Sequence, residues 1–309
     1  MVIIVNFNPA IDCTAHIDTF IAGGLNRIQD VRQDAGGKGI NVAKTLKALG
    51  MDAILCGFMG SNYQIFEQCF RDWNIRHDFV KVDGLNRSNL KIMSKDGSLT
   101  EVNEPSFEVS KEKRDELLHK VLSYVDDHAV VVLSGSLPKN VKSDFVVEII
   151  KECKQLGAKV ILDGDGEVLQ KGILCHPTLI KPNEDELQRY FKVEHALTQE
   201  KIILYAKKLV NQGVEMVCVS CGKDGAICMS QDECYQSSSL NVDVKSTVGA
   251  GDAMVASFAY GLEKKMAMKE MFELAVACST AEIMQEGTQP GPLELVLELK
   301  KNVVADKCK

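Results

Sequence analysis

Short apolar runs alternate with longer amphipathic stretches along most of this chain. The runs are rich in β-branched residues and lie at residues 3–6, 53–58, 130–134, 159–163, 178–181 and 217–220. The stretches between them repeat apolar residues at helical spacing, and three of them, at 39–50, 142–157 and 199–213, end on a glycine, as helices often do. Strands that alternate with helices predict a mostly parallel sheet with helices on both faces. The sequence therefore indicates an α/β sandwich, with further helices after residue 250.

Two regions depart from this rhythm. Residues 16–34 and 89–106 alternate apolar and polar side chains with a period of two, which is typical of strands with one face in solvent. The dipeptide Asp96-Gly97 in the second region favours a two-residue hairpin turn. We expect a small antiparallel sheet that stands off the main one, although the pattern alone fits an extension of the main sheet equally well.

Composition and charge limit the class of protein. The chain has 309 residues, of which 45% are hydrophobic and 26% charged, and this is enough for one large α/β domain. Its net charge of −7 argues against nucleic acid as a partner, and no apolar run is long enough for a signal sequence or a membrane span. The eleven cysteines are an odd number scattered through the chain, which favours a reducing, cytoplasmic setting.

Four of the cysteines, Cys218, Cys221, Cys228 and Cys234, lie close together in the sequence. The Cys-x-x-Cys start raises the question of zinc, but the later spacing is not a second such pair. Residues 214–230 have the pattern of a strand, a glycine turn and a second strand, in which cysteine serves as a small apolar core residue. We expect these cysteines to be structural and no zinc to be bound.

The segment TVGAGDAMVA at residues 247–256 places small residues directly before an aspartate. Residues 241–245 alternate polar and apolar side chains like the end of a strand, and residues 250–261 have the composition and spacing of a helix. The first turn of that helix should therefore contain Gly249, Ala250, Gly251 and Asp252. Free N–H groups in such a turn attract an anion, and glycine lets a ligand approach the backbone. Asp252 would then accept a proton from an attacking hydroxyl, as phosphoryl transfer requires. Taken alone, a capping aspartate beside packing glycines is the commoner meaning of such a segment.

A second glycine-rich loop, DAGGKG at residues 34–39, leads into the amphipathic helix predicted over 39–50. A flexible loop with Lys38 at a helix start suits a phosphate or a cluster of sugar hydroxyls. The signal is weak by itself, because such turns are common before helices. The P-loop motif GxxxxGK[ST] does not occur, and the dinucleotide-binding fingerprint lacks its third glycine. A P-loop enzyme and a nucleotide-dependent oxidoreductase are therefore disfavoured.

Together, the two glycine-rich motifs are specific. GGKGINVA at 36–43 and TVGAGDAMVA at 247–256 resemble the two signatures of the PfkB, or ribokinase-like, carbohydrate kinases. The likeness covers nearly the whole chain, through NPAID at 8–12, SGSLP at 134–138, KPNEDEL at 181–187 and CGKDGA at 221–226, and it is nearest to the 1-phosphofructokinase and tagatose-6-phosphate kinase branch. It implies a single three-layer α/β/α domain over residues 1–309, with a β lid formed by about 13–34 and 88–106.

The resemblance also implies roles on the acceptor side of the site. Asp252 matches the family's catalytic base. Its anion hole corresponds to Gly249, Ala250 and Gly251. The residues that match the sugar-binding positions are Asp12, Gly37, Lys38 and Asn41. Without the resemblance, Asp12 would be read as a turn aspartate after a strand.

On the nucleotide side, the matching positions are Lys181, Asn183, Glu186, Ser220, Gly222 and Gly225. Asn183 and Glu186 have the Asn-x-x-Glu order of the pair that organises Mg²⁺ and phosphate, with Mg²⁺ held largely through water and nucleotide oxygens. Their alternative reading is a helix-capping asparagine with a first-turn glutamate. The resemblance thus implies ATP and Mg²⁺ as cofactors.

An acceptor that already carries a phosphate needs cations in this acidic protein. The segment NRSNLKI at 86–92 supplies Arg87 and Lys91 with Asn89 between them, and this branch of the family has a similar Thr-Arg-x-Asn-x-Lys segment. Arginine suits bidentate phosphate binding, so we expect Arg87, Lys91 and Lys38 to form one basic pocket. The alternative is a set of solvated strand charges.

The chain departs from the family pattern at four positions. Asn86, Asp165, Cys221 and Ser246 stand where a threonine, a serine, a leucine and an Asn or Asp are usual. None of these changes removes a catalytic group. Asp165 adds negative charge near the expected active edge, however, and Asp165 and Asn86 leave the identity of the sugar open.

The resemblance implies ATP- and Mg²⁺-dependent phosphorylation of a ketohexose monophosphate. Fructose 1-phosphate, giving the 1,6-bisphosphate, is the first choice, and tagatose 6-phosphate is the alternative acceptor. A non-catalytic sugar-phosphate sensor with the same fold is the alternative from another class. An exposed apolar lid face would favour a lid-to-lid homodimer.

Overall fold

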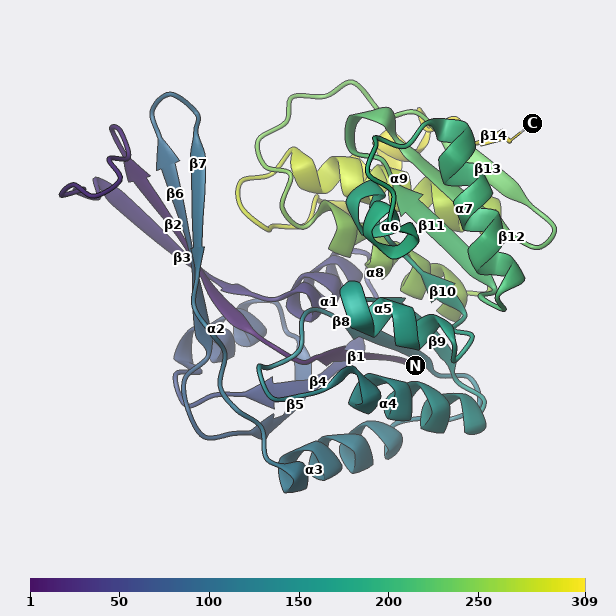
Figure 1. The fold of residues 1–309 in the computed structure, drawn as a ribbon, viewed down its shortest axis with the longest axis horizontal. Coiled ribbons are helices and arrows are strands. Elements are labelled where there is room, and N and C mark those ends of the chain that lie inside the picture. The colour runs from purple at the N-terminus through teal and green to yellow at the C-terminus, as the bar shows by residue number, and fades with distance from the viewer. Residues whose placement is uncertain (309) are drawn as a thin grey trace.

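The structure, a computed structural model, describes residues 1–308 and contains two sheets (Figure 1). The main sheet has ten strands in the order β14-β13-β12-β11-β10-β9-β8-β1-β4-β5. They are β1 Val2–Asn6, β4 Ala53–Met59, β5 Arg76–Lys81, β8 Val130–Ser134, β9 Lys159–Asp163, β10 Leu179–Ile180, β11 Met216–Ser220, β12 Ala226–Ser230, β13 Cys234–Ser237 and β14 Asp306–Lys307. The neighbours from β5 to β11 pair in parallel, and β12, β13 and β14 extend the sheet in antiparallel fashion.

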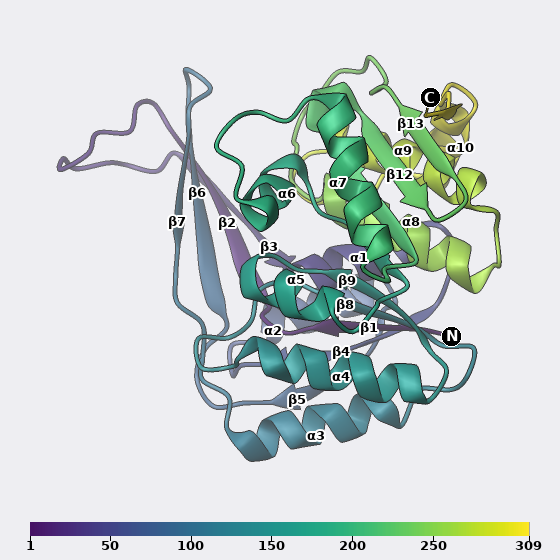
Figure 2. The ribbon, with the colours of Figure 1, turned by 45° about the vertical axis from the view of Figure 1, so that its right-hand side comes forward.

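Helices cover both faces of the main sheet (Figure 2). One face packs against α1 Lys38–Ala48, α2 Gln64–Asp72, α8 Ala250–Glu263, α9 Met268–Ile283 and α10 Leu293–Lys300. The other packs against α3 Lys111–Leu122, α4 Ser143–Gln155, α5 Gly166–Ile173, α6 Glu184–Phe191 and α7 Gln199–Asn211. Alternate residues of a strand point to opposite faces, so Val2 and Ile4 enter one core while Ile3 and Val5 enter the other. This is the three-layer α/β sandwich that the sequence predicts.

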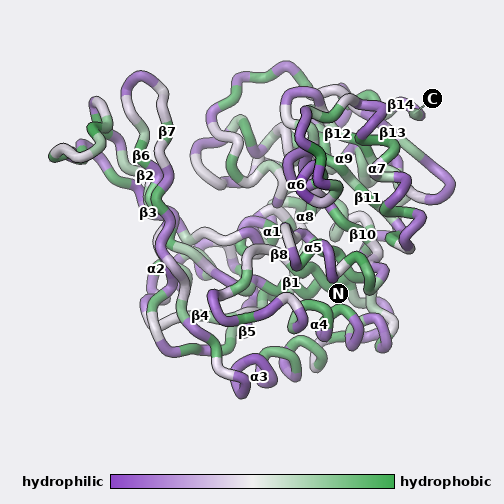
Figure 3. Tube along the Cα trace, in the orientation of Figure 1, coloured by the Kyte–Doolittle hydropathy of each residue, from purple (hydrophilic) through white to green (hydrophobic). Residues whose placement is uncertain are grey.

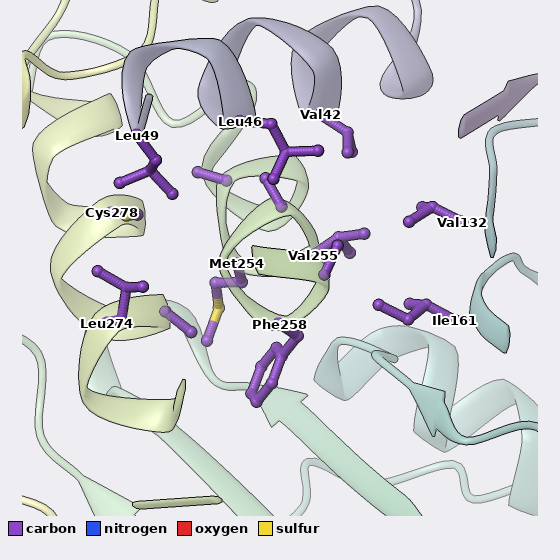
Figure 4. Packing of buried hydrophobic residues seen from close by; sticks show 14 of the residues in the cluster. Val42, Leu46, Leu49, Val132, Ile161, Met254, Val255, Phe258, Leu274 and Cys278 are labelled. Atoms are coloured by element: carbon purple, nitrogen blue, oxygen red, sulfur yellow. The ribbon is translucent and has the colours of Figure 1, made fainter. Parts of the chain in front are cut away.

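Helix α8 lies at the centre of one of these cores. Met254, Val255 and Phe258 pack among side chains of α1 and α9, including Leu46 and Leu274 (Figure 4). All five side chains are at most 5% exposed. Because α8 is buried along most of its length, the core fixes the position of its first turn, where Asp252 lies.

The predicted elements of the main sheet are confirmed. The six predicted strands correspond to β1, β4, β8, β9, β10 and β11, and the three predicted helices to α1, α4 and α7. The glycines that close those helices, Gly50, Gly157 and Gly213, all have positive φ angles. The strand end expected over 241–245 was wrong. This segment is irregular, and it is anchored instead by Lys245 and Ser246, whose N–H groups donate to the carbonyl of Ile283 at the end of α9.

The second sheet projects from the main body, at the left of Figure 1, and confirms the expectation of a separate small sheet. Its order is β3-β2-β6-β7, with β2 Ala10–Ile17, β3 Asp30–Gly36, β6 Arg87–Ser94 and β7 Leu99–Asn103. Two details were wrong. The sheet is mixed, because β2 and β6 both run outward from the main sheet and pair in parallel. The hairpin loop between β6 and β7 spans residues 95–98 rather than two residues.

The pairing register gives the small sheet two different faces. Cross-strand partners share a face, so Arg87, Asn89 and Lys91 of β6 lie with Asp12 of β2. The intervening positions put Val31, Leu90, Ile92 and Val102 on the opposite face. Figure 3 accordingly shows hydrophilic and hydrophobic residues mixed along these strands, whereas the strands of the main sheet are mostly hydrophobic.

The cysteines at β11 to β13 divide into two kinds. Cys218 and Cys228 are buried and directly opposite each other in the β11–β12 pair, and Cys221 is buried in the turn between them, as expected for core residues. Cys234 differs, because it forms a disulfide with Cys308 and so ties β14 to β13. The expectation that Cys234 is a small apolar core residue is therefore wrong. None of the helices within residues 1–308 is long and apolar enough to cross a membrane.

Candidate active site

The carboxyl ends of the central strands gather polar side chains at one edge of the main sheet. Asn6 of β1, Ser134 of β8 and Asp163 of β9 are in register at the last position of each strand. The chain leaves β1 for β4 on one side and later returns to β8 on the other, so this edge is a topological switch point. In open α/β sheets, ligands bind at such a point.

Asp252 reaches this edge from the first turn of α8. It is the third residue of the helix, after Gly249 at the N-cap, and only 6% of its surface is exposed. The Asn41 amide of α1 donates a 2.8 Å hydrogen bond to its Oδ2. Burial raises the pKa of Asp252 to about 6, while the charges of Lys38 and Lys181 and the bond from Asn41 act against that rise. A carboxylate with such a pKa can take up a proton near neutral pH.

The GGKG loop packs closely against the end of β1. Gly37 is the N-cap of α1 and has a φ of 122°, and a Cβ there would lie 3.1 Å from the side-chain amide of Asn6. The Gly39 N–H donates to Asn6 Oδ1 at 3.2 Å. The Oδ1 atom of Asn41, the atom not facing Asp252, is buried without a hydrogen-bond partner. It is an acceptor in need of a donor such as a hydroxyl.

A second polar group lies where the small sheet meets the main one. Asn89 donates to Asp12 Oδ1 at 2.9 Å, and the Lys91 ammonium is 3.7 Å from Asp12 Oδ2. Arg87 shares their face of the sheet, and its Nε is buried without a partner. Burial lowers the pKa of the Arg87 guanidinium, and the charge of Asp12 opposes that effect. A buried guanidinium that lacks a full set of acceptors suits an anionic ligand.

Lys38 pairs with a different carboxylate from Lys91. Its ammonium lies 3.1 Å from Asp163 Oδ2, and the Lys181 ammonium lies 3.8 Å from Asp163 Oδ1. The negative charge of Asp163 holds the pKa of Lys38 well above its ordinary value, against the effect of burial. Sequence reasoning missed Asp163, although its place at the carboxyl end of a predicted strand was a usable signal.

Asn183 and Glu186 form a capping box at the start of α6. Glu186 N donates to Asn183 Oδ1 at 2.8 Å, and Asn183 N donates to Glu186 Oε2 at 2.9 Å. This is the structural reading that the sequence left open, and it engages only one oxygen of Glu186. The backbone of Asn183 also forms an isolated β-bridge with Ser220 at the end of β11. This bridge brings the KPNEDEL and CGKDGA segments together.

A cleft of about 610 Å³ opens at Cys221, Asp224 and Ala226, which are sequence neighbours of Ser220, Gly222 and Gly225. It is lined by residues of α7, β12, the 222–224 turn, the segment 236–240 and the C-terminal segment 302–306. Gly225 has a φ of +93°, and a Cβ there would lie 1.9 Å from the carbonyl oxygen of Ser237, so the turn requires glycine. The last two lining segments had no recognisable signal in the sequence, because they join the cleft only through tertiary packing.

Two departures from the family pattern have structural partners. Asn86 is buried, accepts from the Gly60 N–H and bonds to Asn62, so it holds the turn before β6 together. Asp165 is the N-cap of α5 and pairs with Arg189 at 2.8 Å. Neither side chain makes a contact with Asp12 or Asp252.

The site can now be compared with known proteins. The profile of the pfkB family carbohydrate kinases matches residues 4–294. The chain belongs to this family. It is 36% identical to a 1-phosphofructokinase of Bacillus subtilis over 97% of this chain and 99% of that protein. It is 30% identical to a tagatose-6-phosphate kinase of Staphylococcus epidermidis over 93% and 94% of the two chains.

A solved pfkB structure shows the same architecture. The crystal structure of phosphofructokinase-2 from Escherichia coli in complex with substrates and products superposes with a TM-score of 0.91, at 26% identity, over 97% of this chain and 98% of that one. The membership makes this protein a phosphotransferase that acts on carbohydrate, and pfkB kinases use ATP. The predicted membership of the pfkB family and the predicted α/β/α fold class are both confirmed.

Proposed function

We propose that this kinase phosphorylates a ketohexose monophosphate, with fructose 1-phosphate as the preferred acceptor and fructose 1,6-bisphosphate as the product. The observation that carries the proposal is the environment of Asp252: buried, hydrogen-bonded to Asn41, and placed in a helix turn whose free N–H groups attract anions. Asp252 takes the proton from the acceptor hydroxyl. The amides of Gly249, Ala250 and Gly251 bind the transferring phosphoryl group.

The acceptor lies between the small sheet and α1. Asp12 and Asn41 bind its hydroxyls, since Asp12 is held in place by Asn89 and the free Oδ1 of Asn41 faces no protein donor. Arg87 and Lys91 bind the phosphate that the sugar already carries, because Arg87 Nε is buried and unpaired. In this arrangement, the small sheet closes over the sugar as a lid and excludes water.

The nucleotide lies along the other side of the site. The cleft at Cys221, Asp224 and Ala226 has the size for a nucleoside. Asn183 forms a β-bridge with Ser220, and the Lys181 ammonium lies against Gly251 in the turn that holds Asp252. A carboxylate oxygen of Glu186 outside the capping box fits Mg²⁺ bound through water. When bound, Mg²⁺ neutralises charge on the nucleotide phosphates.

The experiment that tests the proposal measures ATP consumption with Mg²⁺ against fructose 1-phosphate, tagatose 6-phosphate, fructose 6-phosphate, free fructose and ribose. We expect the highest kcat/KM for fructose 1-phosphate, in line with the name of the B. subtilis relative. A higher value for tagatose 6-phosphate would move the chain to the other activity of the branch. Preference for an unphosphorylated sugar would refute the roles of Arg87 and Lys91, and no turnover at all would favour a sensor.

A single variant tests the phosphate site directly. Arg87→Met should raise the KM for the phosphorylated sugar by about 10- to 100-fold, as expected for a lost charge-assisted contact, and leave the KM for ATP unchanged. Arg76→Met is the matched control, because Arg76 lies on β5 with its guanidinium over the Tyr124 ring. Equal KM values for Arg87→Met and Arg76→Met would count against the phosphate site.

A further inference from the structure

We infer that Asp163 is a positioning residue for phosphoryl transfer. Its carboxylate holds Lys38 on the acceptor side of the site and Lys181 on the nucleotide side. The inference rests on the proposed function, since it takes Lys38 and Lys181 to face the phosphates. It goes further because Asp163 itself touches neither substrate in that arrangement. Asp163 acts only through the two lysines.

The Asp163 carboxylate is buried, and each of its two oxygens faces different partners. Oδ2 accepts from the Ser134 hydroxyl at 3.0 Å and lies 3.1 Å from the Lys38 ammonium. Oδ1 is buried, makes no hydrogen bond and lies 3.8 Å from the Lys181 ammonium. Asp163 is 1% exposed and Lys181 is 5% exposed, so neither charge is well solvated. The β8–β9 register, which pairs Ser134 with Asp163, fixes the position of the carboxylate.

The charges in this cluster suit the arrival of an anion. Two ammonium groups lie within 4 Å of one carboxylate, and Asp252, whose charge also acts on both lysines, forms an ion pair with neither. When Asp252 takes up the proton of the acceptor hydroxyl, its negative charge is lost and the two lysines face Asp163 alone. The Lys181 ammonium lies against the first turn of α8, where a Cβ on Gly251 would be only 3.0 Å from Nζ. A phosphoryl group at that turn would then supply negative charge.

Asp163 raises the pKa of two groups around it. Its negative charge is the main cause of the raised pKa of Lys38, so Lys38 stays protonated over the working pH range. The same charge adds to the burial that raises the pKa of Asp252, which makes Asp252 a stronger base. Lys38, Lys181 and the Asn41 amide lower the pKa of Asp252, and Glu186 is a further acidic group near Lys38. One buried carboxylate therefore keeps Lys38 charged and makes Asp252 more basic.

The test compares pH–rate profiles of Asp163→Asn and Asp165→Asn. Both change an aspartate to asparagine near the end of β9, but Asp165 pairs with Arg189 at the surface and asparagine is an equally good N-cap. We expect Asp163→Asn to lower kcat at least 10-fold, with smaller changes in KM, and to move the acid limb of the profile to lower pH. Asp165→Asn should keep the wild-type profile. Wild-type kcat and an unchanged acid limb in Asp163→Asn would overturn the inference.

The outcomes separate this inference from the proposed function. If the wild-type protein phosphorylates none of the sugars, the proposed function fails. If it is active and the Asp163→Asn profile does not move, only the role of Asp163 fails. Thermal unfolding of each variant shows whether it is folded before its kinetics are compared.

A second measurement uses the wild-type protein alone, so it tests the inference even if Asp163→Asn does not fold. An amine-specific acetylating reagent attacks only neutral lysine, and mass spectrometry reads each site. Lys113 is a matched reference, because it is 41% exposed against 40% for Lys38 and pairs with the exposed Glu116. We expect Lys38 to react at least 10-fold more slowly than Lys113 at pH 9. Equal rates would mean that Asp163 does not hold Lys38 in its charged form.

Discussion

Asn41 and Asp252 are 211 positions apart in the sequence, yet the Asn41 amide donates a 2.8 Å hydrogen bond to the Asp252 carboxylate. The bond joins the first turns of α1 and α8, which pack together in one core. Each glycine-rich motif is a weak signal alone, and the fold makes them one site. The bond also stabilises the charged form of Asp252 against the effect of burial.

Replacement of Asp252 tests the base directly. Asp252→Asn keeps the size of the side chain and one acceptor oxygen for the Asn41 amide, but it removes the ability to accept a proton. We expect kcat to fall by about 10²- to 10⁴-fold with little change in the Kd for ATP. Steady-state kinetics and calorimetric ATP titration measure the two quantities. A variant with more than half of the wild-type kcat would exclude Asp252 as the base.

The pH dependence of the wild-type enzyme follows from the raised pKa of Asp252. The base must be deprotonated, so kcat/KM should rise with pH through about 6. Asn41→Leu removes the bond that lowers this pKa, and the acid limb should move to higher pH. Ser257→Ala, further along α8, removes a buried hydroxyl that bonds to the Ala253 carbonyl and should leave the limb in place. An acid limb that stays at the same pH in Asn41→Leu would contradict this coupling.

Local sequence patterns predicted most strands of the main sheet, because these are set by short-range periodicity, but not β5, β13 or β14. The pairing of β2 with β6 joins segments distant in sequence, and their shared outward direction, which makes them parallel, follows from how the chain leaves β1 and β5. Asp163 had no motif of its own, and its importance comes from Lys38 and Lys181, which other elements bring to it. The Cys234–Cys308 disulfide likewise depends on where β14 packs.

Gly249 should tolerate no side chain. Its φ is +91°, and a Cβ would lie 2.4 Å from Glu282 Oε1, so Gly249→Ala adds a clash to backbone strain. We expect a loss of about 1–3 kcal/mol in the free energy of unfolding, together with a marked loss of kcat. Gly50→Ala is the control, because Gly50 has a φ of +76° with open space around it and so experiences the strain alone. Chemical denaturation measures the free energy of unfolding of both variants. An equal loss in Gly249→Ala and Gly50→Ala would mean that the clash with Glu282 adds nothing.

The outer face of the small sheet predicts a homodimer. Val31 and Val102 are more than half exposed on the face opposite Asp12, and Leu90 and Ile92 lie between them. An apolar face of this kind is commonly covered by a second copy. We expect the wild-type protein to elute as a dimer in size-exclusion chromatography with light scattering, and Val31→Lys/Val102→Lys to elute as a monomer. Leu174→Lys, at an exposed site on the C-cap of α5, should not change the mass. A monomeric wild-type protein would rule out this interface.

Glu282 should make stability depend on pH. It is 1% exposed on α9, and Oε2 has no hydrogen-bond partner. Burial and the nearby charge of Asp252 raise its pKa to about 8, while Lys44 opposes the rise. The folded state therefore binds a proton that the unfolded state has already released above pH 4.5. Between about pH 4.5 and 8 this group lowers the free energy of unfolding by up to about 1.4 kcal/mol per pH unit, and the effect levels off above that window.

Glu282→Gln removes this proton linkage while keeping the shape of the side chain. Urea denaturation at pH 5, 6.5 and 8 should show the variant gaining stability relative to the wild-type protein as the pH rises, with the largest difference at pH 8. Glu273→Gln is the control, because Glu273 lies on the same helix, is partly exposed and is 3.9 Å from Lys269. Its difference from the wild-type protein should vary little with pH. If Glu282→Gln also differed from the wild-type protein by a constant amount, Glu282 would be ionised in the folded protein throughout this range.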